Sequence, residues 1–293
     1  MLNNAIEIQS LTKNYPGFSL GPLNFDVPIG CMVGYIGENG SGKSTTLKAI
    51  LGLIHPDSGE IKIFGKNIKE HEPTIMNRIG VVFDNSSIPD EMKVKEVGKF
   101  CKLTFDTWEE VTFHDYVTRF KLPGERKVKT LSRGMKMKLS LSIALSHQAE
   151  LLILDEATSG LDPVVRDEIL DILLDFLQEE THTVLISSDI LSDLEKAADY
   201  IAFLHNGKIL FMEEKDLLVE RYALCSLDHE TIQNLNPDAI VGRRKHAFGQ
   251  DLLVLRELMP TGIKMSKPSI EDIMVYIIKG EEKKEEENES IAL

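Results

Sequence analysis

The stretch at residues 37–45 restricts what this chain can fold into more than any other part of the sequence. It reads Gly-Glu-Asn-Gly-Ser-Gly-Lys-Ser-Thr, which has the spacing G-x-x-x-x-G-K-S. Residues 31–36 before it are apolar and short enough for a buried strand, and residues 46–52 after it read as a helix closed by glycine. In such a unit, backbone N–H groups face a phosphate and the helix N-terminus adds positive potential. The sequence therefore predicts a nucleotide-binding loop.

The residues of this loop have distinct expected roles. We expect Lys43 to reach the β- and γ-phosphates of a nucleoside triphosphate, and the hydroxyl of Ser44 to bind Mg²⁺. The other residues expected to contact the nucleotide are Gly37, Asn39, Gly40, Ser41, Gly42 and Thr45.

Composition excludes some classes of partner. The 293 residues, 42% of them hydrophobic, are enough for one large domain or for a domain with a small appendage. The formal net charge of −14 disfavours a nucleic-acid partner, because a phosphate backbone requires a basic face. No apolar run of 18 residues is present, so we expect any membrane-spanning part to come from another chain. Three scattered cysteines are expected to be core residues in a reducing compartment: Cys31, Cys101 and Cys225.

Strand-like and helical segments alternate over the first 215 residues, which predicts an α/β fold with a parallel sheet. Alternating or uniformly apolar runs predict strands at residues 5–9, 23–27, 59–65, 79–83, 151–154 and 183–188. Helical spacing is found at residues 92–148 and 164–179. We therefore expect a P-loop NTPase core with an antiparallel β subdomain and an inserted α-helical subdomain at about residues 86–148.

The character of the sequence changes after residue 215. Short strand-like runs with turns between them predict a small α+β extension over residues 216–280, followed by an acidic tail at 281–293 that is expected to be disordered. Ser-Ile-Glu-Asp at residues 269–272 predicts a capping box for a final helix. The apolar face of this helix predicts packing on its own domain, with a dimer contact as the alternative; it consists of Ile270, Ile273, Met274, Ile277 and Ile278.

Two adjacent carboxylates follow the apolar run at residues 151–154. Asp155 is placed where a strand delivers a magnesium-binding acid beside a phosphate loop. Glu156 is expected to accept a proton from the water that attacks the γ-phosphate.

Three further motifs resemble one family. Residues 131–135 read Leu-Ser-Arg-Gly-Met, residues 159–162 read Ser-Gly-Leu-Asp, and Tyr15 ends the run Leu-Thr-Lys-Asn-Tyr at residues 11–15. Over about residues 5–215, with its motifs in the order expected along the sequence, the chain resembles the ATP-binding subunit of an ABC transporter. The five residues at 131–135 stand where that family usually has the signature Leu-Ser-Gly-Gly-Gln, and residues 159–162 stand at its D-loop.

The resemblance implies a composite site for ATP and Mg²⁺. Two ATP-binding subunits, identical or different, would close head to tail, with each ATP between the loop of one chain and Ser132 and Gly134 of the other. Asp162 would cross the interface, and Tyr15 would stack on adenine. Closing and opening would drive a polytopic membrane permease, which would hold this ATPase at the cytoplasmic face of the membrane. The motif variants resemble Gram-positive exporter ATPases for bacteriocins and similar peptides, including phenol-soluble modulins.

The sequence departs from the family pattern at the signature and at two other positions. Arg133 and Met135 replace the usual glycine and glutamine of the signature. Asp84 stands where a glutamine usually senses Mg²⁺ and the attacking water. Asp189 stands where a histidine usually contacts the γ-phosphate, and two like charges about 4 Å apart repel by about 4 kcal/mol at an effective dielectric constant of 20. Asp189 is thus either a tolerated variant or the cause of a slow or asymmetric site.

Two other functions stay open at this stage. One is a soluble ABC ATPase that acts on ribosomes or DNA, although such chains usually carry two modules or a coiled-coil insertion. The other is a regulatory subunit that binds ATP but hydrolyses it poorly, which Asp189 favours and Glu156 disfavours. For a transporter, we expect the permease to dock near residues 84–105.

Overall fold

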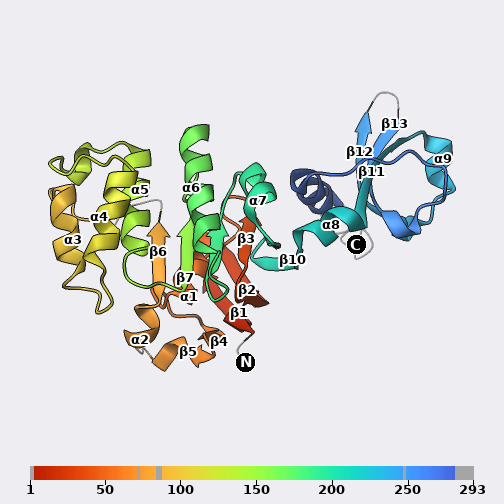
Figure 1. Ribbon diagram of the computed structural model, residues 1–293. Helices are drawn as coiled ribbons and strands as arrows, with labels where there is room; N and C mark the ends of the chain where they lie inside the picture. Colours follow the sequence, from red (N-terminus) through yellow and green to blue (C-terminus); the bar gives the residue numbers. More distant parts are fainter. Residues whose placement is uncertain (1–2, 71–72, 84–87, 247–248, 281–293) are drawn as a thin grey trace. The chain divides into compact units, whose positions relative to one another are not determined.

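The computed structural model describes residues 3–70, 73–83, 88–246 and 249–280, and the chain divides into two compact units (Figure 1). The first unit is Met1–Met212 and the second is Glu213–Leu293. Asp84 and the acidic tail at 281–293 lie outside the described residues. Among the described residues, no helix has both the length and the hydropathy that crossing a bilayer requires.

The first unit is built on a six-stranded sheet with the order β10-β9-β3-β8-β7-β6. Its central strands are parallel and almost completely buried, as expected when both faces of a sheet are covered. Their bounds are β3 Met32–Gly37, β6 Ile79–Phe83, β7 Leu151–Asp155, β8 Thr183–Ser187, β9 Tyr200–His205 and β10 Lys208–Glu214. Strand β8 therefore lies between the strand that leads into the phosphate loop and the strand that ends in Asp155.

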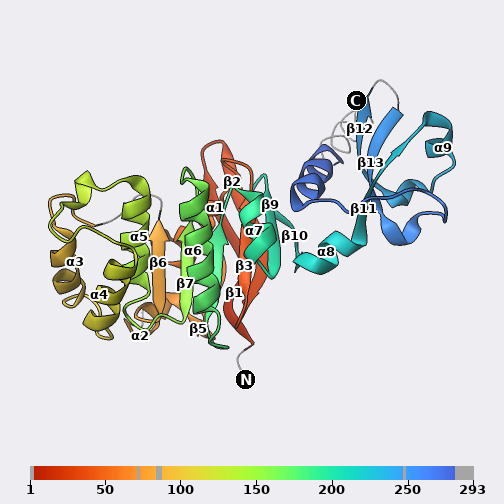
Figure 2. The same ribbon diagram turned by 45° about the horizontal axis from the view of Figure 1, so that its top comes forward.

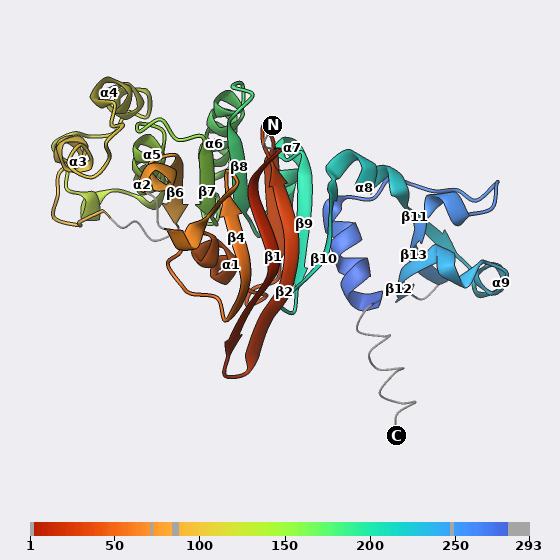
Figure 3. The same ribbon diagram turned by 90° about the horizontal axis from the view of Figure 1, so that it is seen from below.

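A second, four-stranded sheet with the order β2-β1-β4-β5 packs against one side of the parallel sheet. Helices α6 and α7 lie on the other side (Figure 3). One hydrophobic core with side chains from both sheets and from α1 joins these layers. The bounds are β1 Asn4–Tyr15, β2 Phe18–Pro28, β4 Ser58–Ile63, β5 Lys66–Asn67, α1 Lys43–Ile50, α6 Pro163–Phe176 and α7 Leu191–Ala197.

The inserted helices lie beyond the β6 edge of the parallel sheet (Figure 2). They are α3 Val94–Cys101, α4 Glu110–Arg119 and α5 Arg133–Ala144, and the short helix α2 Pro73–Met76 precedes β6. Helix α5 packs on β6 and carries the chain back to the core. Its first turn begins at the N-cap Ser132, whose hydroxyl oxygen accepts a hydrogen bond from the backbone N–H of Met135 (3.3 Å).

The second unit is a three-stranded antiparallel sheet with the order β11-β13-β12 and a final helix at residues 270–280. The bounds of its strands are β11 Tyr222–Leu227, β12 Ile240–His246 and β13 Gly249–Leu255, and its shorter helices are α8 Lys215–Arg221 and α9 His229–Gln233. Ser269 and Asp272 form the predicted capping box, with Ser269 N donating to Asp272 and Asp272 N donating to Ser269. The helix passes so close to β12 that a Cβ at Gly242 would collide with the carbonyl of Tyr276. Ile270, Ile273 and Ile278 are buried.

The observed architecture confirms the predicted fold class of an α/β P-loop core with an antiparallel subdomain and inserted helices. The sequence analysis did not identify strand β9, although its apolar run Ile201–Leu204 is as uniform as that of β7. Strand β9 pairs with β3 and so supports the outer side of the phosphate loop.

Candidate functional site

The phosphate loop joins β3 to α1 and bends at two glycines in the left-handed region. Gly40 has a φ of 84° and Gly42 has a φ of 111°. A Cβ at Gly42 would lie 2.6 Å from the side chain of Leu20, and a Cβ at Gly37 would collide with the carbonyl of Leu204. The loop can therefore follow this path only with glycine at these positions, and it is pressed between β2 and β9.

Lys43 is buried and its ammonium group is held by the loop itself. It donates to the carbonyl oxygens of Gly37 (2.7 Å) and Glu38 (3.2 Å). Ser41 is also buried, and its hydroxyl has no hydrogen-bond partner in the described part of the chain. A buried hydroxyl and a buried ammonium group beside exposed loop backbone suit a phosphate group, which accepts several hydrogen bonds. Ser44 and Thr45 follow in the first turn of α1, both half-buried.

A buried tyrosine fixes the start of α1 against the sheet. The hydroxyl of Tyr35 donates to Thr46 (3.0 Å), whose hydroxyl donates in turn to the carbonyl of Gly42 (3.0 Å). Burial raises the pKa of Tyr35 well above its usual range, so its hydroxyl stays protonated and remains a donor. The sequence analysis missed this contact, although a lone tyrosine in a buried strand is a signal for a hydrogen bond.

The paired carboxylates lie at the same edge of the sheet as the phosphate loop, because parallel neighbours all end there. Ser187, at the end of β8, donates a hydrogen bond of 2.6 Å to Asp155. The backbone N–H of Glu156 points to the Ser187 hydroxyl (3.0 Å) and to the Ser187 carbonyl (3.1 Å). Ser187 is completely buried. A single serine thus fixes the orientation of Asp155 and the backbone of Glu156.

Glu156 has a strained backbone. Its φ is 52°, in the left-handed region that non-glycine residues seldom adopt, and its side chain is half-buried. Strain of this kind costs about 1–3 kcal/mol and is concentrated at functional sites, where it aims a side chain. The strained backbone therefore bends the chain out of the line of β7 directly after Asp155.

Asp189 follows the end of β8 at this same edge and is exposed. None of the hydrogen bonds or ion pairs between described residues engages its carboxylate. The neighbouring backbone is fixed, because Ser188 is buried and its hydroxyl accepts a hydrogen bond from Ile190 N (3.0 Å). Asp189 is thus free to turn toward a metal ion or away from a phosphate.

The signature residues and the D-loop form a separate hollow of about 260 Å³. Ser132 and Gly134 at the start of α5 meet Asp162 at the start of α6, where Asp162 caps the helix by accepting from Val165 N (3.1 Å). The guanidinium group of Arg133 lies against Gly160, in the space that a Cβ would occupy. No residue of the phosphate loop lines this hollow, so the structure brings the predicted residues together in two groups rather than one.

Tyr15 lies at the tip of the β1–β2 hairpin and is 42% exposed. The same hairpin reaches the phosphate loop, because a Cβ at Gly42 would lie 3.0 Å from the ring of Phe18. The ring of Tyr15 is therefore available for stacking close to the loop, with the ammonium group of Lys13 5.7 Å from its centroid.

His205 is a further neighbour of the loop that the sequence did not suggest. It ends β9, is 9% exposed, and its Nδ1 lies 3.2 Å from the carboxylate of Glu38 in the loop. The next turn also contacts the loop, with Gly207 N donating to the carbonyl of Ser41 (3.1 Å).

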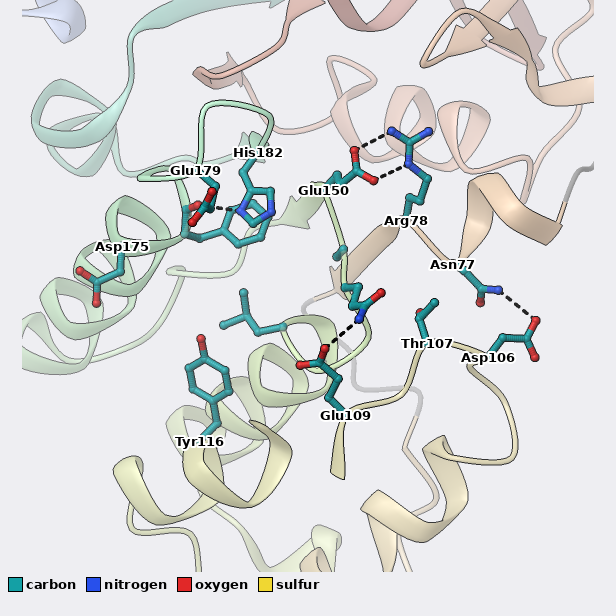
Figure 4. A pocket seen from close by; sticks show the side chains of 14 residues that line it. Asn77, Arg78, Asp106, Thr107, Glu109, Tyr116, Glu150, Asp175, Glu179 and His182 are labelled. Carbon is teal, nitrogen blue, oxygen red and sulfur yellow. Dashed lines mark hydrogen bonds and ion pairs between the residues drawn. The ribbon is translucent and has the colours of Figure 1, made fainter. Parts of the chain in front are cut away.

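A second pocket, of about 740 Å³, lies at the opposite edge of the parallel sheet, where β6, β7 and β8 begin (Figure 4). Arg78 donates two hydrogen bonds of 2.6 Å to Glu150, and Asn77 donates to Asp106 (3.2 Å). The contact between Asn77 and Asp106 joins the core to the connection between the inserted helices α3 and α4. His182 also lines this pocket, at the far end of β8 from Asp189, so it does not replace the missing histidine.

Comparisons with known proteins identify the family of this chain. A family model described as ABC transporter matches residues 20–159. The bacitracin transport ATP-binding protein BcrA of Bacillus licheniformis is 36% identical over 309 residues, which span 95% of this chain and 99% of that protein. The chain belongs to the ATP-binding proteins of ABC transporters. This ABC ATPase binds and hydrolyses ATP, as the sequence motifs predicted.

Other relatives match a little under three quarters of this ABC ATPase. The lantibiotic transport ATP-binding protein SrtF of Streptococcus pyogenes is 36% identical over 220 residues, spanning 72% of this chain and 91% of that protein. A solved ATP-binding subunit of an ABC transporter is 27% identical with a TM-score of 0.68, covering 74% of this chain and 92% of that chain. A bacterial ABC transporter cassette solved as a dimer shares the fold, with a TM-score of 0.65 at 21% identity, covering 71% of this chain and 98% of that chain.

Replacing Ser187 tests the arrangement of the two carboxylates. We expect Ser187→Ala to lower ATP turnover by about ten- to a hundredfold, because an unpaired buried group costs about 1–3 kcal/mol. Steady-state turnover and equilibrium ATP binding would be measured on the same preparation. The matched control is Ser142→Ala, an equally buried serine that only bonds the carbonyl of Lys138 in its own helix. Equal turnover in the two variants would show that Ser187 does not organise the site.

Replacing Asp189 tests whether this residue slows the enzyme. We expect Asp189→His to raise ATP turnover, by up to about a hundredfold, because a hydrogen-bond donor would then replace a negative charge beside the expected position of the γ-phosphate. Asp189→Asn serves as the comparison, since it removes the charge without the imidazole. Unchanged or lower turnover of the histidine variant, with folding intact by circular dichroism, would contradict a slowing role.

Proposed function

We propose that this ABC ATPase powers the export of antimicrobial or toxin-like peptides from a Gram-positive bacterium through a separate membrane permease. The observation that carries this proposal is the match to the bacitracin transport protein, which extends over 95% of the chain and so includes the second unit. The lantibiotic transport relative supports the same class of cargo, because bacitracin and lantibiotics are both peptides. The protein would then act at the cytoplasmic face of the membrane, held there by the permease.

The residues at the sheet edge would hydrolyse ATP as follows. Lys43 and the N–H groups of the loop would bind the phosphates, while Glu156 would accept the proton of the attacking water. Mg²⁺ would neutralise charge on the transferred phosphoryl group. Ser44 and Asp155 supply oxygen ligands that suit this ion, which usually takes one or two protein ligands besides phosphate and water. The part of the chain that the structure describes contains no cluster of three metal-binding side chains. Asp84 is proposed as a further ligand or water sensor.

The second half of each site would come from another ATP-binding subunit. Ser132, Gly134 and Asp162 line a hollow that no residue of the phosphate loop enters, so we propose that they contact the nucleotide of a partner. The start of α5 would direct its positive end at the γ-phosphate of that nucleotide. The partner could be a second copy of the chain or a different one.

The permease would dock on an apolar hollow of about 280 Å³ between β6, α3 and α5. Six of its ten lining residues lie within residues 84–105, where the family resemblance led us to expect the permease. Its walls are almost entirely apolar, and Phe100 on its rim is 47% exposed. An amphipathic helix of a membrane protein would bury such a surface by inserting its apolar face.

A regulatory subunit that binds ATP but hydrolyses it slowly is the second candidate. The exposed, unpaired Asp189 in the position of the usual histidine favours it. A ribosome- or DNA-bound ATPase is the third, and the net charge of −14 disfavours it. Isolation of the protein with its native partners separates these functions: a polytopic membrane protein supports transport, and ribosomes or DNA contradict it.

Replacing the proposed base tests the catalytic assignment. We expect Glu156→Gln to lower ATP turnover by about a hundredfold or more while ATP binding is kept, because general-base catalysis contributes about 10²–10⁴-fold. Turnover is measured by phosphate release and binding with a fluorescent nucleotide. Glu179→Gln, an exposed carboxylate beside the second pocket, controls for loss of charge. Survival of turnover in Glu156→Gln would mean that another group is the base.

Replacing Phe100 tests the docking surface. We expect Phe100→Glu to reduce co-purification of the membrane partner by about tenfold or more, because a charge would be buried in an apolar contact. Val111→Glu is the matched control, since Val111 is 74% exposed on the neighbouring helix α4 and does not line the hollow. Equal loss of the partner in both variants, or in neither, would place the contact elsewhere.

A further inference from the structure

Helices α6 and α7 are joined by two ion pairs of opposite character. Lys196 and Asp167 meet at 3.1 Å on the surface, with side chains 65% and 63% exposed. Arg166 and Asp193 meet at 3.5 Å between the helices, with side chains 22% and 6% exposed. Exposed pairs contribute little to stability, whereas a buried pair imposes geometry on both of its partners.

The buried pair is only half formed. Nη1 of Arg166 approaches Oδ1 of Asp193, and this is its one contact with the carboxylate. Within the described residues, Nε of Arg166 and Oδ2 of Asp193 are both buried without a hydrogen-bond partner. A guanidinium group binds a carboxylate with two parallel hydrogen bonds through Nε and Nη2, as Arg78 binds Glu150. Arg166 now offers Nη1 instead, and both Nε and Oδ2 stay unpartnered. A small shift of the helices that lets the guanidinium group turn would therefore complete the pair.

The two helices begin at two parts of the candidate site. Asp162, at the end of the D-loop, caps α6, and the backbone N–H of Arg166 closes the first turn on the Asp162 carbonyl (3.0 Å). Helix α7 follows Asp189, and Asp193 N donates to the carbonyl of Ile190 (3.1 Å). Because Ile190 N is also bonded to Ser188, the position of Asp193 fixes the short segment that carries Asp189.

We propose that Arg166 and Asp193 are positioning residues that couple the D-loop to Asp189. When a partner subunit presses on the D-loop, α6 shifts against α7, the guanidinium group turns into the two-bond contact, and Asp189 is held at a fixed distance from Asp155. Closure at one subunit interface would thus set the geometry around the γ-phosphate bound to the same chain. This inference rests on the proposed roles of Asp162 and Asp189.

The test uses the full-length chain with its native partners and compares four variants. Asp193→Asn breaks the buried pair. The double variant Arg166→Met with Asp193→Leu replaces both partners by apolar side chains and leaves no buried charge unpaired. Arg166→Lys keeps the charge but lacks the planar fork. The matched control is the double variant Asp167→Asn with Lys196→Gln, which removes the exposed pair from the same two helices. Measurements are kcat, KM for ATP and the midpoint of thermal unfolding.

A positioning role predicts a particular split between these measurements. We expect the apolar double variant to recover the unfolding midpoint that Asp193→Asn loses, while its kcat stays at least about tenfold below wild type, because misplaced reacting groups slow catalysis. Its KM should change by less than about threefold, since the phosphate loop is intact. Arg166→Lys should also lower kcat, and the control should match wild type in all three measurements.

Several results would overturn the proposal. A wild-type kcat in the apolar double variant would show that the pair is merely structural, and a raised KM with unchanged kcat would assign it to nucleotide binding. A wild-type kcat in Arg166→Lys would exclude the bidentate contact. An equal loss of kcat in the control variant of Asp167 and Lys196 would show that any disturbance between α6 and α7 lowers kcat, without a particular role for the buried pair. Failure of the proposed transport function is distinguished by isolating the protein with its native partners: ribosomes or DNA in place of a polytopic membrane protein would contradict transport, whatever the pair variants do.

Discussion

The hydrogen bonds of Ser187 tie together the ends of two neighbouring strands, and the chemistry of the site depends on them. Ser187 donates to Asp155 and accepts from the backbone of Glu156, so one buried hydroxyl orients a metal-binding candidate and a base candidate together. The strained φ of Glu156 is sustained by these bonds. The phosphate loop follows the adjacent strand β3, which runs parallel to β8 and pairs Tyr35 with Ser187. The sheet therefore delivers the residues proposed to bind phosphate and to accept a proton to one edge.

Local signals made much of this structure predictable. The phosphate loop, the caps at Ser132 and Ser269, and the apolar strands before Asp155 and Asp189 are short patterns whose physical causes lie within a few residues. The family resemblance and the ATPase activity inferred from these motifs are confirmed by the relatives. Such patterns can be recognised because loop glycines, helix caps and buried strands each require particular residue types at particular positions.

The contacts that were missed connect residues that are distant in the sequence. Ser187 meets Asp155 across a strand pair, and His205 meets Glu38 only because β9 lies next to β3. The ion pair between Arg166 and Asp193 depends on how α6 packs on α7, and nothing in either helix indicates it. The register between strands and the packing of helices are properties of the whole fold, which one sequence does not display. The effects of Asp84 and Asp189 on turnover stay predictions.

The separation of the signature hollow from the phosphate loop has a genetic consequence. In a head-to-tail dimer, a defect at Lys43 and a defect at Ser132 would damage different nucleotide sites when they are carried by the same chain. Carried by different chains of a mixed dimer, they would fall on one shared site and leave the other complete. Two defective alleles could then support each other in one cell, whereas either allele alone would leave both sites impaired.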